Sequence, residues 1–293
     1  MNGRLQLYDK TQIEKNNLLF DNKALAALLF PLIIEQLLNS FMGMADTMMV
    51  SNVGSAAISA VSLVDSVNML VIQVFSALAT GAAIICSQYI GSRNIKECNN
   101  AARQVVLSVA VISVSLMIIG IIFRYPLLRL IFGSVEADVM DNSLVYFLIT
   151  VCSYPFLALF NVGAAFFRAD GNARYPMTIS VISNIINIIG NAILIFGLSM
   201  GVAGAAISTL ISRIFCMVVV FCSLRKPKQT IVINDILKIR PDMKLIKRVL
   251  SIGIPAGIEN GMFQFGKLAI QSTVSSMGTA AIAAQAMTNI LEN

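Results

Sequence analysis

The chain has 293 residues, of which 57% are hydrophobic and only 12% are charged, and its mean hydropathy is +0.81. Soluble domains carry about 25% charged residues, so a water-soluble globular protein is excluded and lipid is the expected solvent for most of the chain. The absence of histidine excludes histidine-based catalysis and histidine-liganded metal sites. No aromatic-basic module accompanies the net charge of +6, so we expect no nucleic-acid partner.

The first 23 residues are polar, with basic and acidic side chains interleaved. They lack the apolar core and small-residue cleavage site of a secretory signal, so we expect a cytoplasmic tail over 1–23. The five cysteines follow no metal-ligand spacing, and we expect them to be small apolar fillers.

Apolar runs long enough to cross about 30 Å of hydrocarbon follow the tail. Seven lie near 24–50, 57–90, 104–123, 142–167, 176–199, 203–224 and 249–276, and an eighth begins after Gly278. None alternates like a barrel strand, so each is expected to be a helix. The sequence therefore predicts an all-α polytopic membrane protein.

Lysine and arginine are concentrated in alternate loops. The tail, the 91–103 loop, the loop with Arg168 and Arg174, and the 225–248 linker hold 17 of the 21 basic residues, against two on the other side. Basic loops stay in the cytoplasm, so we expect a multi-pass protein of the cell (plasma) membrane with its N-terminus inside.

Part of the sequence is repeated 224 residues later. The offset pairs Pro31 with Pro255 and Gly54 with Gly278, and 12 of 39 positions are identical between 31–69 and 255–293. Six spans separate the copies, so the two halves are expected to run parallel. We expect a six-helix lobe over 24–224, a basic cytoplasmic linker over 225–248 and the start of an incomplete second lobe over 249–293. The chain is thus interpreted as a fragment.

Polar side chains inside the spans are candidates for function. Asp46 lies toward the outer end of the first span, and Asn184, Asn187 and Asn191 share one face of the fifth. An acid at this depth is costly, and its default interpretation is an ion or proton site. The alternatives are an interfacial aspartate that caps the helix end and, for the amides, helix–helix hydrogen bonds. Oxygen ligands suit a hard cation such as Na⁺.

Four further polar residues are candidates. Glu35 and Glu259 each lie four residues after a proline, which frees a backbone carbonyl and favours a kinked, polar segment. Lys267 is a possible partner of Glu259 or of an acid in the second lobe. Arg213 in the sixth span needs a partner, for which Asp46 and Glu35 are candidates, and a structural ion pair is its expected role.

Asp65 forms a polar notch with Ser62, Ser66 and Asn68 in the second span. We interpret Asp65 as a near-surface acid, and we expect its replacement to matter far less than that of Asp46.

Three segments together carry a family resemblance. They are "GMADTMMVSNVGSAAISAVS" from Gly43, "FFRADGNARYPMTISVISNIINIIGNAILIFGLSMGVAGAAISTLIS" from Phe166 and "GIPAGIENGMFQFGKLAIQS" from Gly253. They resemble the multidrug and toxic compound extrusion (MATE) family of twelve-helix antiporters with two six-helix lobes. The resemblance implies export of organic, often cationic, compounds in exchange for Na⁺ or H⁺ by alternating access, with no cofactor and a monomer when full length.

The resemblance also bears on single residues. The family's N-x-x-x-D pattern matches Asn187 and Asn191, and Asn191 stands where many members have Asp, which removes one titratable group. In several groups the functional acid of the seventh helix lies at the position of Phe263, so the transfer of that role to Glu259 is approximate.

Other functions remain open at this point. Flippases of lipid-linked oligosaccharides share the fold and are the alternative within it. A membrane-embedded enzyme would need convergent nucleophile, acid and base groups, and the sequence shows none. A channel or receptor would not need the parallel repeat.

Overall fold

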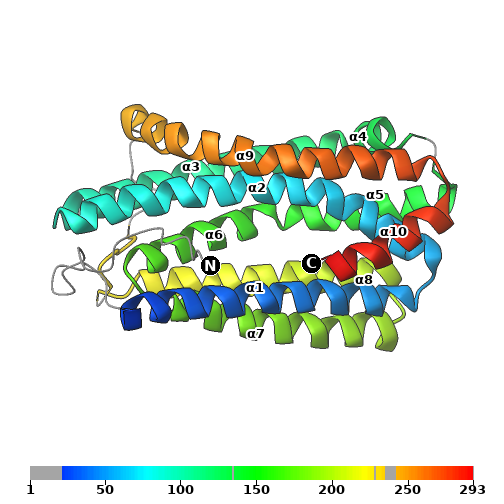
Figure 1. The fold of residues 1–293 in the computed structure, drawn as a ribbon, viewed down its shortest axis with the longest axis horizontal. Coiled ribbons are helices and arrows are strands. Elements are labelled where there is room, and N and C mark those ends of the chain that lie inside the picture. Colours follow the sequence, from blue (N-terminus) through cyan, green and yellow to red (C-terminus); the bar gives the residue numbers. More distant parts are fainter. Residues whose placement is uncertain (1–21, 134, 228, 235–241, 293) are drawn as a thin grey trace, which may run out of the picture.

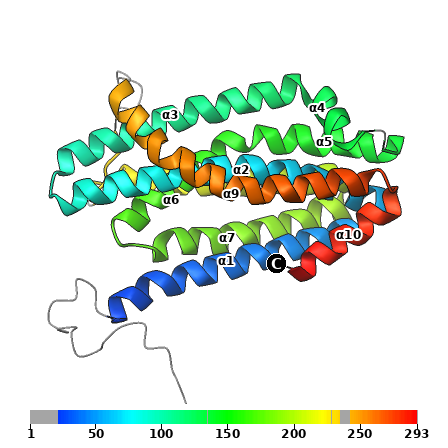
Figure 2. The ribbon, with the colours of Figure 1, turned by 45° about the horizontal axis from the view of Figure 1, so that its top comes forward.

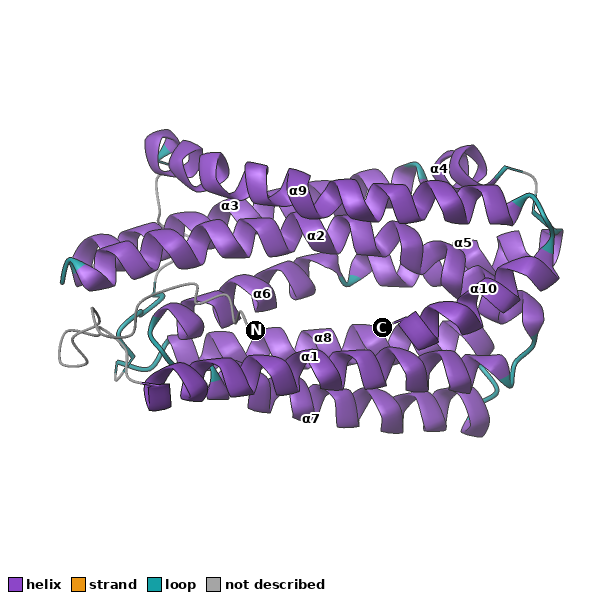
Figure 3. Cartoon of the chain, in the orientation of Figure 1, coloured by secondary structure: helices purple, strands orange, loops and turns teal. Residues whose placement is uncertain are grey.

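The computed structural model describes residues 22–292 except 134, 228 and 235–241. Within this part the chain is helical and contains no strand (Figure 3). The helices in chain order are α1 (Asn22–Ser51), α2 (Ser55–Gly91), α3 (Ile95–Ile122), α4 (Arg124–Phe132), α5 (Ala137–Cys152), α6 (Tyr154–Ala169), α7 (Arg174–Asn191), the π-helical η2 (Ala192–Gly197), α8 (Gly201–Leu224), α9 (Met243–Ser275) and α10 (Thr279–Glu292). The predicted all-α fold is confirmed, and the N-terminal tail and the centre of the linker lie outside the described residues.

Most of the predicted spans correspond to single long helices. Among the described residues, α1, α2, α3, α8 and the continuous α7–η2 segment are long and apolar enough to cross a membrane. The fourth predicted span is a pair, α5 and α6, bent by 44° at Ser153. Pro155 follows at the start of α6, where a missing N–H is tolerated, so the break is encoded locally.

The long helices run side by side along the long axis of the molecule, and their connections alternate between its two ends (Figure 1). The α2–α3 turn, the α6–α7 turn and the described ends of the α8–α9 connection lie at the end where α1 begins. These are the connections that carry the basic residues. The short helix α4 lies at the opposite end. Figure 2, turned by 45°, shows α9 lying over α2.

Helix α2 lies at the centre of the packing and contacts α9, α6, α5, α10 and α3. Its contact with α9 is close because small residues face each other. A Cβ on Gly81 would lie 2.8 Å from the carbonyl oxygen of Val249, and a Cβ on Gly253 would lie 2.9 Å from that of Ala77. Only glycine permits this approach of two backbones.

The repeated sequence forms the same turn twice. Gly54 and Gly278 both have positive φ, 136° and 97°, a region that favours glycine. The same backbone bonds surround them: Ile58 N–H donates to Gly54 O at 3.2 Å, and Ile282 N–H donates to Gly278 O at 3.3 Å. Helices α1 and α9, which lead into these turns, each contain the repeated proline. The repeat is therefore structural as well as sequential.

The ends of the linker that the structure describes lie against α3. Val232 N–H donates to Asn99 Oδ1 and Asp242 N–H donates to Gln104 Oε1, both at 3.0 Å. Asp242 then caps α9 by accepting from Lys244 N–H at 2.9 Å. These bonds fix where α9 begins relative to the first six spans.

Candidate functional site

Asp46 of α1 meets two buried amides of α7. Asn191 Nδ2 donates to Asp46 Oδ1 at 2.5 Å and to Asn187 Oδ1 at 3.2 Å. Both asparagine side chains are 0% exposed. The predicted grouping of Asp46, Asn187 and Asn191 is thus present in the fold, and the bond from Asn191 shows that Asp46 contacts α7 rather than only capping its own helix.

The amide of Asn187 has two possible orientations, and they differ in what they require of Asp46. As drawn, Asn187 Nδ2 donates to Thr209 Oγ1 at 3.2 Å. With the amide reversed, its nitrogen would donate to Asp46 Oδ1 at 2.8 Å. In the drawn orientation, Asn187 Oδ1 lies 2.8 Å from Asp46 Oδ1. Two acceptor oxygens at this distance need a proton or a cation between them. The reversed amide instead stabilises the free carboxylate.

The sequence around these amides shapes the site. A Cβ on Gly190 would overlap Ser208 Oγ, so the glycine allows α8 to approach α7. Ser208 Oγ donates to the carbonyl of Asn187 at 2.7 Å. Directly after Asn191 the chain widens into the π-helix η2, a feature that often marks functional sites. The sequence analysis did not identify Ser208 and Thr209 as site residues. The only signal in the sequence is that they are hydroxyl residues in the middle of an apolar span.

The donor set suits a small hard cation or a proton. Asp46 supplies a carboxylate, and Asn187 and Thr209 supply neutral oxygens. Asn191 Oδ1 is buried and has no hydrogen-bond partner in the described part of the chain, so the site holds an acceptor that its neighbours do not satisfy. Any Na⁺ would be held by these oxygens, and a proton would be carried by Asp46.

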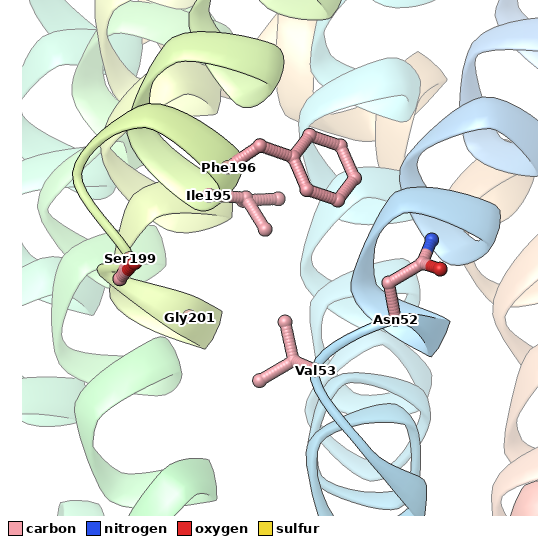
Figure 4. A pocket seen from close by; sticks show the side chains of 6 residues that line it. All are labelled: Asn52, Val53, Ile195, Phe196, Ser199 and Gly201. Atoms are coloured by element: carbon pink, nitrogen blue, oxygen red, sulfur yellow. The ribbon is translucent and has the colours of Figure 1, made fainter.

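A pocket of about 240 Å³ opens beyond this contact, at the end of the bundle where α1 ends (Figure 4). Asn52 and Val53 line it from the end of α1, and Ile195 and Phe196 line it from η2. The pocket therefore lies between the helix end that follows Asp46 and the segment that follows Asn191.

A second polar group surrounds Asp65 of α2. Asp65 Oδ1 accepts from Asn68 Nδ2 at 3.2 Å and from Tyr146 Oη at 3.3 Å. Tyr154 Oη donates to Asn68 Oδ1 at 2.8 Å. Tyr146 and Tyr154 come from α5 and α6, so Asp65 faces the interior of the bundle. The interpretation of Asp65 as a near-surface acid was wrong. Helical periodicity within α2 gives no information about tyrosines on α5 and α6 that pack against it.

Arg213 of α8 lies beside this group. Its Nη1 donates to Ser153 Oγ, at the bend between α5 and α6, at 2.5 Å. Glu35, which was a candidate partner of Arg213, instead pairs with Arg168 Nη2 at 2.8 Å and accepts from Ser180 at 3.3 Å. The expected pairing of Arg213 with Glu35 was wrong, because Glu35 forms its ion pair with Arg168 at the end of α6.

The remaining candidates are spread over other parts of the fold. Asn184 lies on the same helix as Asn187, and its Nδ2 has no partner among the described residues. Lys267 is exposed on α9. Phe263 and Glu259 lie on α9, but their side chains are outside the described residues, so the role of Glu259 stays a prediction.

Comparison with known proteins identifies the family. The model of the MatE family matches residues 31–193, which is more than half of the chain. The chain belongs to the MatE family. The matched region contains Asp46, Asn187 and Asn191, and the MATE resemblance seen in the sequence is confirmed.

Relatives of this MatE chain are transporters by name. It is 29% identical over 278 residues to the uncharacterized transporter YisQ of Bacillus subtilis (strain 168), covering 90% of the chain and 58% of the relative. It is 24% identical over 262 residues to the multidrug export protein MepA of Staphylococcus aureus (strain MRSA252), covering 89% and 57%. The chain therefore spans less than two thirds of the length of these relatives.

A solved structure supports the fold. The chain is similar to the inward-facing conformation of a multidrug resistance MATE family transporter of the MOP superfamily, with a TM-score of 0.79 and 23% identity over 90% of this chain and 60% of that one. The protein is thus a multi-pass membrane protein with the MATE fold.

Proposed function

We propose that this chain is part of a secondary active transporter that exports organic, often cationic, compounds in exchange for Na⁺ or H⁺ by alternating access. The observation that carries the proposal is the carboxylate of Asp46 beside the buried amides of Asn187 and Asn191. A charge in an apolar bundle is costly, and a site that gains and loses a cation can use that cost to drive a conformational change. The multidrug names of relatives support the substrate class.

The physical cycle follows from this geometry. Without a cation, Asp46 is charged and needs the amide donors of α7, which hold α1 against α7. With a proton or Na⁺ bound, the carboxylate no longer needs these donors, and the α1–α7 contact weakens. Coupling requires that the two states differ in their affinity for the ion and for the organic substrate.

The proposal places the protein in the plasma membrane with its N-terminus in the cytoplasm, as a monomer that acts on small molecules and on no nucleic acid. It assigns transport rather than catalysis, and the coupling ion is the only non-protein component that it requires.

Counterflow in vesicles tests the proposal. The full-length transporter that contains this chain is reconstituted in proteoliposomes loaded with unlabelled ethidium, and uptake of labelled ethidium is followed with and without gradients of H⁺ or Na⁺. A carrier gives transient accumulation of the label and responds to one of the gradients. Uptake without counterflow would indicate a channel, and transport of lipid-linked oligosaccharide in place of ethidium would indicate a flippase; either result would overturn the proposal.

A further inference from the structure

The buried cluster around Asp46 extends to two more charges that the coupling site does not use. Asp65 lies on α2 with hydrogen bonds from Asn68 and Tyr146. Arg213 lies on α8, one helical turn after Thr209, whose hydroxyl oxygen accepts from Asn187 Nδ2 at 3.2 Å. Arg213 also donates to Ser153, and the adjacent Tyr154 donates to Asn68, which in turn donates to Asp65. The three charged side chains therefore lie along one series of polar contacts inside the bundle.

Arg213 is held in place by a neutral partner rather than by a carboxylate. Its Nη1 donates to Ser153 Oγ at 2.5 Å, and Ser153 Oγ donates to the carbonyl of Thr150 at 2.6 Å. Ser153 is fixed at the bend before Pro155. The one direct ion pair in the described part of the chain joins Arg168 and Glu35, so Arg213 is salt-bridged to neither Asp46 nor Asp65.

The charges that face the cluster can be counted helix by helix. The ionisable groups are Asp46 on α1, Asp65 on α2, Tyr146 on α5, Tyr154 on α6, and Arg213 and Cys216 on α8. Helix α7 contributes only amides and hydroxyls to this region, Lys267 on α9 is exposed, and Glu35 on α1 is neutralised by Arg168. Phenols and thiols are neutral near pH 7, and a guanidinium keeps its charge. Among the side chains that the structure describes, two negative charges and one positive charge remain.

We propose that Arg213 is the resident counter-ion of Asp65. The charge of Asp46 is then not balanced within the cluster, and the site takes up one monovalent cation in each transport cycle. This inference rests on the proposed coupling role of Asp46 and deepens it. The anchor at Ser153 keeps the guanidinium from moving onto Asp46, where it would replace the driving ion. Arg213 and Asp65 are thus positioning residues that set the charge of the site without touching the cation.

A charge-reversal series tests the inference without any substrate. The chain contains no tryptophan, so Phe196→Trp, in the pocket beside the site, supplies a fluorescence signal and serves as the reference protein. The purified protein in detergent is titrated with Na⁺ at fixed pH and with H⁺ in the absence of Na⁺. The same titration is applied to Asp65→Asn, Arg213→Met, the double variant and Arg213→Lys.

The expected results follow the net charge of the cluster. Arg213→Met makes it more negative, so the half-saturating cation concentration should fall about tenfold or more, while Asp65→Asn makes it neutral and should raise that concentration by about tenfold or abolish the response. The double variant and Arg213→Lys restore the original charge and should return to within about threefold of the reference. If Arg213 and Asp65 only stabilised the fold, removing both charges would not restore the cation affinity of the reference protein.

The outcomes separate this inference from the proposed function. If the double variant binds cations as weakly as Asp65→Asn, the charge-balance inference is overturned. If Asp65→Asn does not fold, Arg213→Met against Arg213→Lys still decides, and equal cation affinities would overturn it. Asp46→Asn addresses the coupling site itself: a full fluorescence response in that variant would overturn the assignment of Asp46, whatever the other variants do.

Discussion

Asn191 donates its amide hydrogen to the carboxylate of Asp46 across 2.5 Å, and the two residues are 145 positions apart in the sequence. The bond joins the first predicted span to the fifth within one lobe. It places a carboxylate against a neutral donor, so the proposed uptake of a proton or a cation by Asp46 would weaken the α1–α7 contact.

Replacing Asp46 by Asn should uncouple transport. The substitution keeps the shape of the side chain but removes the charge that a cation must neutralise. Ethidium efflux from proteoliposomes should lose its dependence on the H⁺ or Na⁺ gradient, with expression little changed. The exposed Asp141 is the matched control, and Asp141→Asn should keep the gradient dependence. Gradient-driven efflux that persists in Asp46→Asn would contradict the prediction.

Replacing Asn191 by Asp should strengthen cation binding or add a pH-dependent step. Two carboxylates would then face each other at the present 2.5 Å contact, and their repulsion favours uptake of a proton or a cation. The pH profile of ethidium efflux should gain a transition or shift to higher pH. Asn100→Asp, at an exposed position near the start of α3, should leave the profile unchanged. An unchanged profile in Asn191→Asp would argue against a shared site.

The pair Glu35–Arg168 should stabilise the packing of α1 against α6. Glu35 is 8% exposed, and Glu35→Gln leaves the guanidinium of Arg168 with a weaker partner. We expect a loss of about 1–3 kcal/mol in the free energy of unfolding, seen as a lower melting temperature in detergent. The double variant Glu35→Gln/Arg168→Gln should cost less than the sum of the single variants. Additive effects would mean that the pair contributes no coupling energy.

The contact between α2 and α9 should depend on the absence of a side chain at Gly253. In Gly253→Ala the new Cβ would meet the carbonyl oxygen of Ala77 at 2.9 Å, so the helices must separate. The melting temperature in detergent should fall. Gly266→Ala is the control, because its Cβ would meet no atom within 4 Å, and an added Cβ in a helix is neutral or stabilising there. Equal effects of the two substitutions would contradict the close approach.

The basic loops predict the orientation in the membrane. A reporter at the N-terminus and one in the 225–248 linker should both be cytoplasmic, and reporters after Gly54 or Gly201 should be outside. Accessibility to a membrane-impermeant thiol reagent at introduced cysteines measures this. A linker that reacts from the outside would overturn both the topology and the parallel repeat.

The sequence by itself determined the class of protein and most of its helices. A low charge content and long apolar runs leave only a helical membrane protein, because backbone groups in lipid must bond within their own segment. The repeat at 224 residues pairs Gly54 with Gly278, and both adopt positive φ, a region that favours glycine. Helical periodicity also placed Asn187 and Asn191 on one face.

Only the tertiary structure decided which polar groups meet. Asp65 lies among Tyr146 and Asn68, Arg213 binds Ser153 at the bend of the fourth span, and Glu35 binds Arg168. Apart from the local pair Asp65–Asn68, these contacts join residues far apart in the chain, and the apolar pattern around each polar residue is nearly the same. Period and composition fix the face of a helix, but the partner of that face depends on how the helices pack, which close contacts at residues such as Gly190 and Gly253 determine.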